Sequence, residues 1–481
     1  MSGHGYGCTY VLSNYVLNKE KRVTRGRDRG WVGQVAAACL AAMCAVAALP
    51  GQAWAAGEPH PYEFDSAVKP VEGAAVNSAG PTLNAGSAYK DSIKPGEKRY
   101  YRVNLDAETH AYISAVAVPG LDAKLAYADE LEVTIEDRSG SRCGNDDARF
   151  GSGAYSRPVA AYADRTIDEN SRTCQEAGPY FVLLERSGPD TSSQDPWDVE
   201  IRFASEPGLT QSAPTAAPEN WPSASPAPPA GSPEKRHGGT SFNDATSIEQ
   251  GEWQDEIAPG QTLFYRVPVD WGQQIFASAD LGTSTVSRAP DGRGSGSNAM
   301  QLTLHNPARG YVGDGSSVYY DGKQESTALD PLPPVAYENR YGSGDAVEAM
   351  RFAGWYYLSV SLNPKVAEGF GEAALLLTLR VNIEGRAKGA PAYAGPAGDF
   401  EVTQDDRDAA GSGKSAPEAA KSDTMELVAA AGIGAGTVLV LGLGVWTLVA
   451  RRRAAAGAAD AAAGADAVMP GPGQYGPPPA R

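Results

Sequence analysis

The stretch from Tyr89 to Asp106, YKDSIKPGEKRYYRVNLD, decides the fold because the chain contains it a second time. Its counterpart runs from Trp253 to Asp270 and reads WQDEIAPGQTLFYRVPVD. Every equivalent pair of positions is separated by the same 164 residues, so the match is collinear. Such self-similarity at a fixed spacing predicts a duplicated domain.

Both copies show the period-two pattern of half-buried strands. The pattern occurs at Tyr101–Leu105, Leu131–Ile135 and Tyr180–Leu184, and again at Tyr265–Val269, Met300–Leu304 and Tyr356–Val360. Pro95-Gly96 and Pro259-Gly260 suit the second and third positions of a type II turn. Neither copy has the apolar pattern of an amphipathic helix of three or more turns. The predicted fold class is therefore all-β, with two tandem antiparallel, jelly-roll-like β-sandwiches and one C-terminal transmembrane helix.

Two shorter matches extend the repeat. The segment Pro158–Arg165 matches Pro333–Arg340, and Gly178-Pro-Tyr180 matches Gly354-Trp-Tyr356. We interpret both as a buried tyrosine with its turn, which requires no ligand.

The N-terminal region has the order of a secretory signal peptide: basic residues, an apolar run from Val32 to Leu49, and the small-residue site Ala53-Trp54-Ala55. We expect cleavage after Ala55, with an uncleaved anchor as the alternative. Translation starting near Val23 is also open.

A second apolar stretch, Leu427–Ala450, is long enough to cross a hydrocarbon core of about 30 Å. Acidic residues precede it and Arg451, Arg452 and Arg453 follow it, so the positive-inside rule places the tail in the cytoplasm. The sequence thus predicts a single-pass type I protein of the cell membrane, with its repeats outside the cytoplasm.

These features divide the chain into eight parts. They are a signal peptide (1–55), an N-terminal arm (56–83), the first repeat (84–207), a Pro/Ala/Ser-rich linker (208–239), the second repeat (240–386), a stalk (387–424), a transmembrane helix (425–450) and a cytoplasmic tail (451–481). Because the linker has few apolar side chains, we expect it to be mobile and the repeats to fold as separate units.

The chain carries a formal net charge of −17, and removal of the basic signal segment brings it to about −21. Nucleic acid and anionic lipid are therefore poor candidate ligands for the exported part. The expected partners are the membrane, through the helix, and an envelope protein or glycan.

Only two cysteines, Cys143 and Cys174, follow the predicted cleavage site. Two cysteines in an exported chain usually pair, so we expect a disulfide inside the first repeat. It would close a loop of about thirty residues and contribute roughly 3 to 4 kcal/mol.

The repeated phrase, Ile-x-Pro-Gly-x followed by Tyr-Arg-Val and an apolar-Asp close, and then a strand such as Tyr112-Ile-Ser-Ala, resembles bacterial pre-peptidase C-terminal domains. It is also similar to ectodomains of actinobacterial membrane proteins. The resemblance covers both repeats. It implies a jelly-roll-like accessory or binding module with no catalytic residue of its own, although no peptidase domain accompanies it in this chain.

The sequence gives little evidence for a catalytic site. The mature chain lacks HExxH, GxSxG, CxxC and P-loop patterns. Ser66-Ala-Val-Lys69 and Ser232-Pro-Glu-Lys235 have the SxxK spacing of serine enzymes, but that chemistry requires a helix, which neither segment favours. His110 and His305 fall in strand-like stretches without a second histidine nearby, so zinc is not expected.

Calcium has a weak candidate site in Asn145, Asp146 and Asp147, which we place on a loop beside Cys143. Asp106 and Asp270, at equivalent ends of the repeated strand, are alternatives. A solvated turn and a strand-end hydrogen bond are the competing interpretations, and no cofactor is expected.

The resulting hypothesis is a non-catalytic, membrane-anchored binding or scaffolding protein of the bacterial cell envelope. An envelope hydrolase with an unrecognised site is one alternative. An accessory subunit of a secretion or signalling complex is the other.

Overall fold

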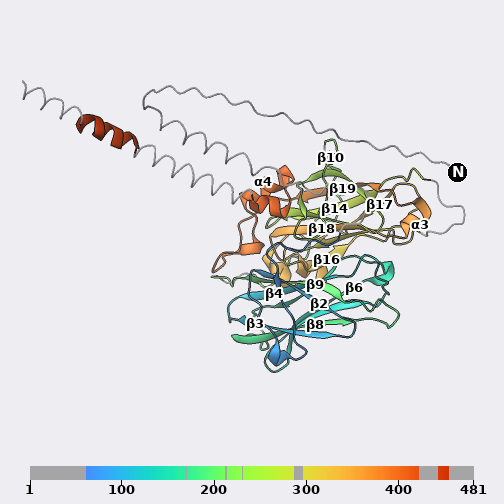
Figure 1. Cartoon of the computed structure of the whole chain (residues 1–481), viewed down its shortest axis with the longest axis horizontal. Helices are drawn as coiled ribbons and strands as arrows, with labels where there is room; N and C mark the ends of the chain where they lie inside the picture. The colour runs from blue at the N-terminus through green and yellow to red at the C-terminus, as the bar shows by residue number, and fades with distance from the viewer. Residues whose placement is uncertain are drawn as a thin grey trace, which may run out of the picture. The chain divides into compact units, whose positions relative to one another are not determined.

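The computed structural model describes residues 61–168, 171–211, 214–229, 231–286, 296–421 and 443–453 (Figure 1). The predicted signal peptide lies outside these ranges, as does most of the predicted transmembrane helix. Among the helices in the described ranges, none has both the length and the hydropathy that crossing a bilayer requires.

The first repeat folds into two facing sheets. One has the strand order β1 (Lys69–Pro70), β2 (Ser87–Ile93), β9 (Trp197–Glu206), β4 (His110–Val118) and β7 (Val159–Arg165); the other has β3 (Lys98–Leu105), β8 (Gly178–Ser187), β5 (Glu130–Glu136) and β6 (Arg142–Arg149). The alternating residues Leu131, Val133 and Ile135 of β5 point into the core between the sheets and are fully buried.

The second repeat builds its two sheets in the same way. One has the order β10 (Glu234–Lys235), β12 (Gly251–Ile257), β19 (Leu375–Glu384), β14 (Gln274–Leu281) and β17 (Glu325–Ala328); the other has β11 (Thr246–Ser247), β13 (Thr262–Val269), β18 (Gly354–Leu362), β15 (Met300–His305) and β16 (Tyr311–Asp314). Its core residues include Leu302, Leu304 and Leu358.

The two repeats share one topology. The order β2-β9-β4-β7 facing β3-β8-β5-β6 recurs as β12-β19-β14-β17 facing β13-β18-β15-β16. This interleaving of early and late strands is that of a jelly roll. The prediction of an all-β fold built mostly from antiparallel pairs is thereby confirmed, and the two repeats have the same strand order.

The repeated phrase forms the same turn in both copies. Glu97 N donates to Lys94 O across 3.1 Å, and Gln261 N donates to Ala258 O across 3.0 Å. The turn needs a positive φ at its third position, which Gly96 and Gly260 supply with φ values of 71° and 83°.

Each sandwich begins earlier in the sequence than predicted. β1 pairs in parallel with β2, with Lys69 opposite Tyr89, and β10 pairs in parallel with β12, with Glu234 opposite Trp253. The predicted starts at residues 84 and 240 missed these strands because two residues are too few to show a period. The SxxK segments run into these strands, with Lys69 in β1 and Lys235 in β10, and neither segment is helical.

The two shorter matches have different outcomes. Tyr180 Oη donates to Glu176 O and Tyr356 Oη to Phe352 O, four residues upstream in both cases, so that match is structural. The other match is wrong: Pro158–Arg165 covers β7, whereas Pro333–Arg340 leads into the 3-10 helix η3 (Tyr337–Tyr341). The counterpart of β7 in the sheet order is β17.

Between residues 61 and 412, the other helices of the described ranges are short: η1 (Asn77–Ala79), η2 (Gly151–Gly153), α2 (Asp345–Ala349), α3 (Val366–Phe370), η4 (Gly398–Phe400) and α4 (Gln404–Ser412). α4 begins with a capping box between Thr403 and Asp406 and ends at Gly413 in the left-handed region. Within residues 387–421, where we expected a stalk, the chain lies against the sandwiches, and Phe400 is fully buried.

The sandwiches also differ from the expectation of separate units, because two further apolar clusters contain residues of both. In one, Val116 and Ala160 of the first repeat contact Phe242 and Phe264 of the second. In the other, Tyr112 of the first repeat joins Phe352 and Phe400. The outer face of the β1-β2-β9-β4-β7 sheet is therefore covered by the second repeat.

The predicted linker also makes contacts over its described part. Thr210 N donates to Ala392 O across 2.7 Å, and Gln274 Nε2 donates to Pro222 O across 2.8 Å. The described part of the linker is thus hydrogen-bonded to β14 of the second repeat and to the segment that follows this repeat.

Candidate functional site

Three arginines of the second repeat reach carboxylates on the covered face of the first. The pairs are Arg309 with Glu200 at 3.2 Å, Arg340 with Glu206 at 2.8 Å, and Arg351 with Asp164 at 3.4 Å. All three guanidinium groups are buried. Since a buried charge without a partner is very costly, these pairs fix how the two sandwiches dock.

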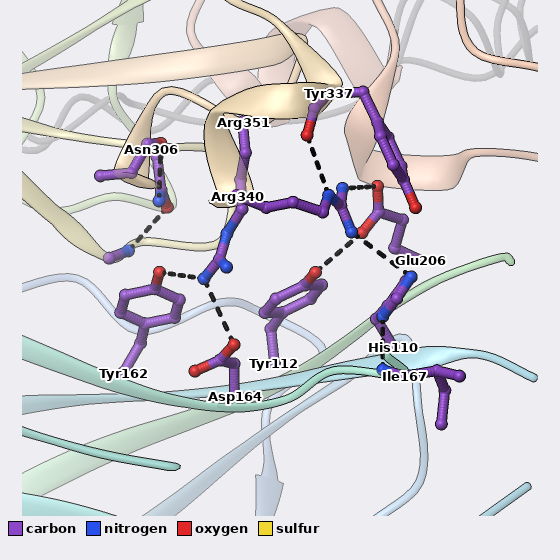
Figure 2. A network of polar contacts seen from close by, with 12 residues as sticks. His110, Tyr112, Tyr162, Asp164, Ile167, Glu206, Asn306, Tyr337, Arg340 and Arg351 are labelled. Atoms are coloured by element: carbon purple, nitrogen blue, oxygen red, sulfur yellow. Dashed lines mark hydrogen bonds and ion pairs between the residues drawn. The ribbon is translucent and has the colours of Figure 1, made fainter. Parts of the chain in front are cut away.

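Glu206, at the end of β9, is the centre of one network (Figure 2). Its carboxylate accepts hydrogen bonds from Arg340 Nη2 and from the hydroxyls of Tyr112 and Tyr393, the last two at 2.7 Å. Burial alone would raise the pKa of Glu206, but the charge of Arg340 and these hydrogen bonds lower it below the ordinary value. Glu206 is therefore ionised, and its carboxylate is hydrogen-bonded to residues of the interface.

A neighbouring network forms around Glu200, on the same strand. Tyr62 Oη donates to Glu200 Oε2 across 2.6 Å and Asn243 Nδ2 donates across 2.9 Å. Asn243 Oδ1 in turn accepts from Arg309 Nη2 at 2.7 Å. Arg309 occupies the β15–β16 turn at a φ of 63°, a conformation held by Asn306, whose Oδ1 accepts two backbone N–H groups of the turn.

Arg351 forms the third of these ion pairs. Its Nη2 donates to Tyr162 Oη across 2.7 Å and faces Asp164 Oδ2 at 3.4 Å (Figure 2). The guanidinium also lies near the rings of Tyr112 and Phe352, at 5.5 and 5.4 Å from the ring centroids.

The two strand histidines are both buried. His110 Nδ1 accepts from Ile167 N across 2.9 Å, and its Nε2 lies 3.3 Å from Arg340 Nη1. Burial lowers the pKa of His110 to about 4. Burial, with a smaller contribution from Arg309, lowers the pKa of His305 to about 3. Both rings are neutral at pH 7.

Beside this interface the two sandwiches enclose a cleft of about 240 Å³. Its lining comes from β6, β7 and the turn before β7 on one side and from β15, β16 and β18 on the other: Asp146, Asp147, Ala148, Arg149, Arg157, Pro158, Val159, Ala160, Gln301, Thr303, His305, Tyr311, Asp314, Ser359 and Ser361. We call this the interdomain cleft. Most of these side chains are polar, so it can bind a ligand through hydrogen bonds.

Two carboxylates of the interdomain cleft have defined partners. Asp314 Oδ1 accepts from Tyr311 Oη across 2.9 Å. Asp146 Oδ2 accepts from Tyr162 N across 3.1 Å, and burial raises the pKa of Asp146 to about 6. The cleft therefore contains a carboxyl group that gains or loses its proton near neutral pH.

The predicted calcium residues lie elsewhere than expected. Asn145, Asp146 and Asp147 are consecutive residues of β6, not of a loop, so their side chains alternate between the two faces of the sheet. Asp147 is paired with Arg149 at 2.8 Å. In the ranges that the structure describes, no group of three or more His, Cys, Asp or Glu residues could hold a metal ion.

The alternative positions have protein partners as well. Asp106 Oδ1 accepts from the backbone N–H groups of Glu108 and Thr109 at 2.9 and 2.7 Å, in a turn that caps β3. Asp270 Oδ2 accepts from Arg407 Nη2 of α4 across 2.6 Å. The strand-end hydrogen bond is thus present at both positions.

The disulfide between Cys143 and Cys174 is present, with a Cα–Cα distance of 5.7 Å. It ties β6 to the segment before β8 and lies only in the first repeat, which confirms the predicted pairing.

Sequence reasoning missed the three interface arginines and the interdomain cleft. One available signal was β4, whose nine residues, HAYISAVAV, are almost continuously apolar, a pattern of strands covered on both faces. Nothing in the sequence showed which surface supplies the cover.

No family model matches this sequence, and no curated protein matches it. Solved structures with weak likeness include that of Broad Bean Stain Virus, at 8% identity and a TM-score of 0.18, covering 71% of this chain and 98% of the other. Another is the ANX1 ectodomain from Arabidopsis thaliana, at 8% identity and a TM-score of 0.16, covering 62% and 89%. Likenesses at these TM-scores carry no argument about this protein.

Proposed function

We propose that this chain is a membrane-anchored, extracytoplasmic and non-catalytic binding protein of the cell envelope, in which the two sandwiches act as one rigid body. The observation that carries the proposal is the buried interface: three arginines of one repeat meet three carboxylates of the other beside a preformed polar cleft. Preorganisation of this kind lowers the entropic cost of binding.

The anchor and the export signal in this proposal rest on the sequence alone. The basic and apolar order of residues 1–55 and the apolar stretch Leu427–Ala450 support them. The jelly-roll-like strand order is consistent with the resemblance to accessory domains, which stays a prediction.

A sedimentation experiment tests the proposed function. The full-length chain is mixed with cell-wall polysaccharide freed of lipid and protein, so that insertion of the apolar stretch into membrane cannot contribute. We expect saturable retention in the pellet and no release of soluble fragments. Retention no greater than that of serum albumin would overturn the proposal.

One observation favours the rival function, an envelope hydrolase. Asp146, with its pKa of about 6, shares the interdomain cleft with Asp147 and Asp314, and glycosidases use a carboxyl group of raised pKa together with a second carboxyl group. Release of soluble fragments in the sedimentation experiment, abolished by Asp146→Asn, would identify an enzyme in place of a binding protein.

A further inference from the structure

The interdomain cleft has walls from both sandwiches, and its chemistry restricts what it can bind. One wall is β6 and β7 with the turn before β7, and the other is formed by β15, β16 and β18. The arginine pairs hold these walls together, so the cleft does not depend on closure around a ligand.

Its polar lining offers both donors and acceptors. Hydroxyl groups come from Thr303, Ser359 and Ser361, and an amide group comes from Gln301. A ligand that fits this mixture must itself carry many groups that both donate and accept, as hydroxyl groups do.

The cationic side chains of the cleft are paired with other groups of the protein. Arg149 is paired with Asp147 and also with Glu130. Arg157 donates to the carbonyl oxygens of Phe150 and Tyr155 and is buried. With these cations engaged and carboxylates present, an anionic ligand is disfavoured, and a neutral ligand suits the site best.

An aromatic ring lies at the mouth. Tyr311 is 43% exposed, and its hydroxyl is fixed by Asp314. Its ring lies 6.4 Å from that of His305 in an edge-on arrangement. A fixed, partly exposed aromatic face provides an apolar platform for the C–H groups of a sugar ring.

His305 adds an unused polar atom. Within the described residues its buried Nδ1 has no hydrogen-bond partner, although such atoms are normally paired. The volume of about 240 Å³ is below the range of about 300–1,000 Å³ typical of sites for drug-sized ligands, so the occupant is small.

Resting on the proposed binding function, we infer that the interdomain cleft binds one neutral sugar ring, free or within a glycan chain. Tyr311 supplies the stacking face, and Asp314, Gln301 and the hydroxyl groups of Ser359 and Ser361 supply the hydrogen bonds.

Saturation-transfer NMR tests this inference. The full-length chain, in a detergent without a sugar headgroup, is titrated with methyl glycosides of glucose, mannose, galactose, arabinose and N-acetylglucosamine. We expect millimolar binding of at least one glycoside. Tyr311→Ala and Asp314→Asn should each weaken it by about tenfold.

Tyr127→Ala is the matched control, because Tyr127 is 65% exposed and does not line the cleft. It should leave glycoside binding unchanged. The inference would be overturned if no glycoside bound at concentrations 20-fold above the expected millimolar dissociation constant. Equal binding by Tyr311→Ala and the unchanged chain would also overturn it. Polysaccharide retention by the unchanged chain would still stand in that case, so failure of the cleft is distinguishable from failure of the proposed function.

Discussion

Arg340 donates to Glu206 across 2.8 Å, and this bond joins two sandwiches that share one duplicated sequence. The two side chains are 4% and 0% exposed. The equivalent surfaces are not used twice: carboxylates come from the first repeat and arginines from the second. The interface is therefore heterologous, although the domains have the same topology.

Removal of one member of this pair should be strongly destabilising. Arg340→Met leaves the Glu206 carboxylate buried without its cation, which should lower the free energy of unfolding by about 3–5 kcal/mol. Glu206→Leu should have a cost of the same order. The double variant should cost less than the sum, because no isolated charge is left in the interface. Urea unfolding of the four proteins measures this coupling.

The exposed pair Arg138–Glu176 provides the control, since its side chains are 62% and 82% exposed. Arg138→Ala should change the free energy of unfolding by no more than about 1 kcal/mol. Strict additivity of the two buried substitutions would contradict the proposed coupling.

A second prediction concerns the close approach at the β15–β16 turn. A Cβ at Gly310 would lie 2.4 Å from Cε1 of Tyr162 in the first repeat, whereas a Cβ at Gly313 would meet nothing within 4 Å. Gly310→Ala should therefore destabilise the protein by about 1–3 kcal/mol, and Gly313→Ala should have little effect. Thermal unfolding of both variants checks the difference, and equal midpoints would show that the contact is not formed.

The duplicated phrase explains why the sequence predicted the fold of each unit. Tyr101 Oη donates to Asp91 Oδ2 across 2.6 Å, and Tyr265 Oη donates to Asp255 Oδ2 across 2.7 Å. Residues that make one local interaction recur together in both copies. Local spacing was therefore enough to predict the strands and the turns, and the disulfide followed from the presence of only two cysteines after the predicted cleavage site.

The interface could not be predicted in the same way. Arg340 and Glu206 are 134 residues apart, and neither lies in a pattern that differs from an ordinary surface charge. The match of Arg165 with Arg340 was misleading, because Arg165 instead binds the carbonyl oxygens of Asp106, Thr109 and Cys174 within its own repeat. Docking of two domains depends on shape and on charge pairing across long separations, which periodicity does not encode.

The third prediction is an acid-sensitive interface. The pKa of His110 is lowered from 6.5 to about 4 by burial, with Arg340 and Arg351 adding to the effect and Glu206 opposing it. Because the pKa of His110 is lower in the folded state than in the unfolded state, its contribution to stability is complete above pH 6.5. That contribution, about 3 kcal/mol at most, is lost as the pH falls from 6.5 towards 4.

Urea unfolding at pH 7, 5.5 and 4.5 tests this dependence. His110→Gln keeps an acceptor for Ile167 N and should lose less stability between pH 6.5 and 4 than the unchanged chain. His305 acts in the same direction, whereas Asp146, whose pKa is raised to about 6, gives a stability that falls as the pH rises from about 4 to 6. An identical pH profile for the two proteins would exclude a role for His110.

The fourth prediction is that the two sandwiches unfold together. Eight of the nine residues of β4 are buried, because one face of this strand meets its own core and the other meets the second repeat. A piece covering residues 61–211 would expose Tyr112 and Val116 to water and lose the shared clusters. Calorimetry of the full-length chain should show one transition for the described body, with a calorimetric enthalpy close to the van't Hoff value.

Pieces covering 61–211 and 231–421 should each melt at least about 5 °C below the full-length chain, because each lacks the partner that covers its apolar face. The Arg340→Met variant should lower the midpoint of this single transition, since it weakens the docking and leaves both cores intact. Two transitions in the unchanged chain, at the midpoints of the isolated pieces, would show that the sandwiches are independent units and that the arginine pairs contribute little to holding them together.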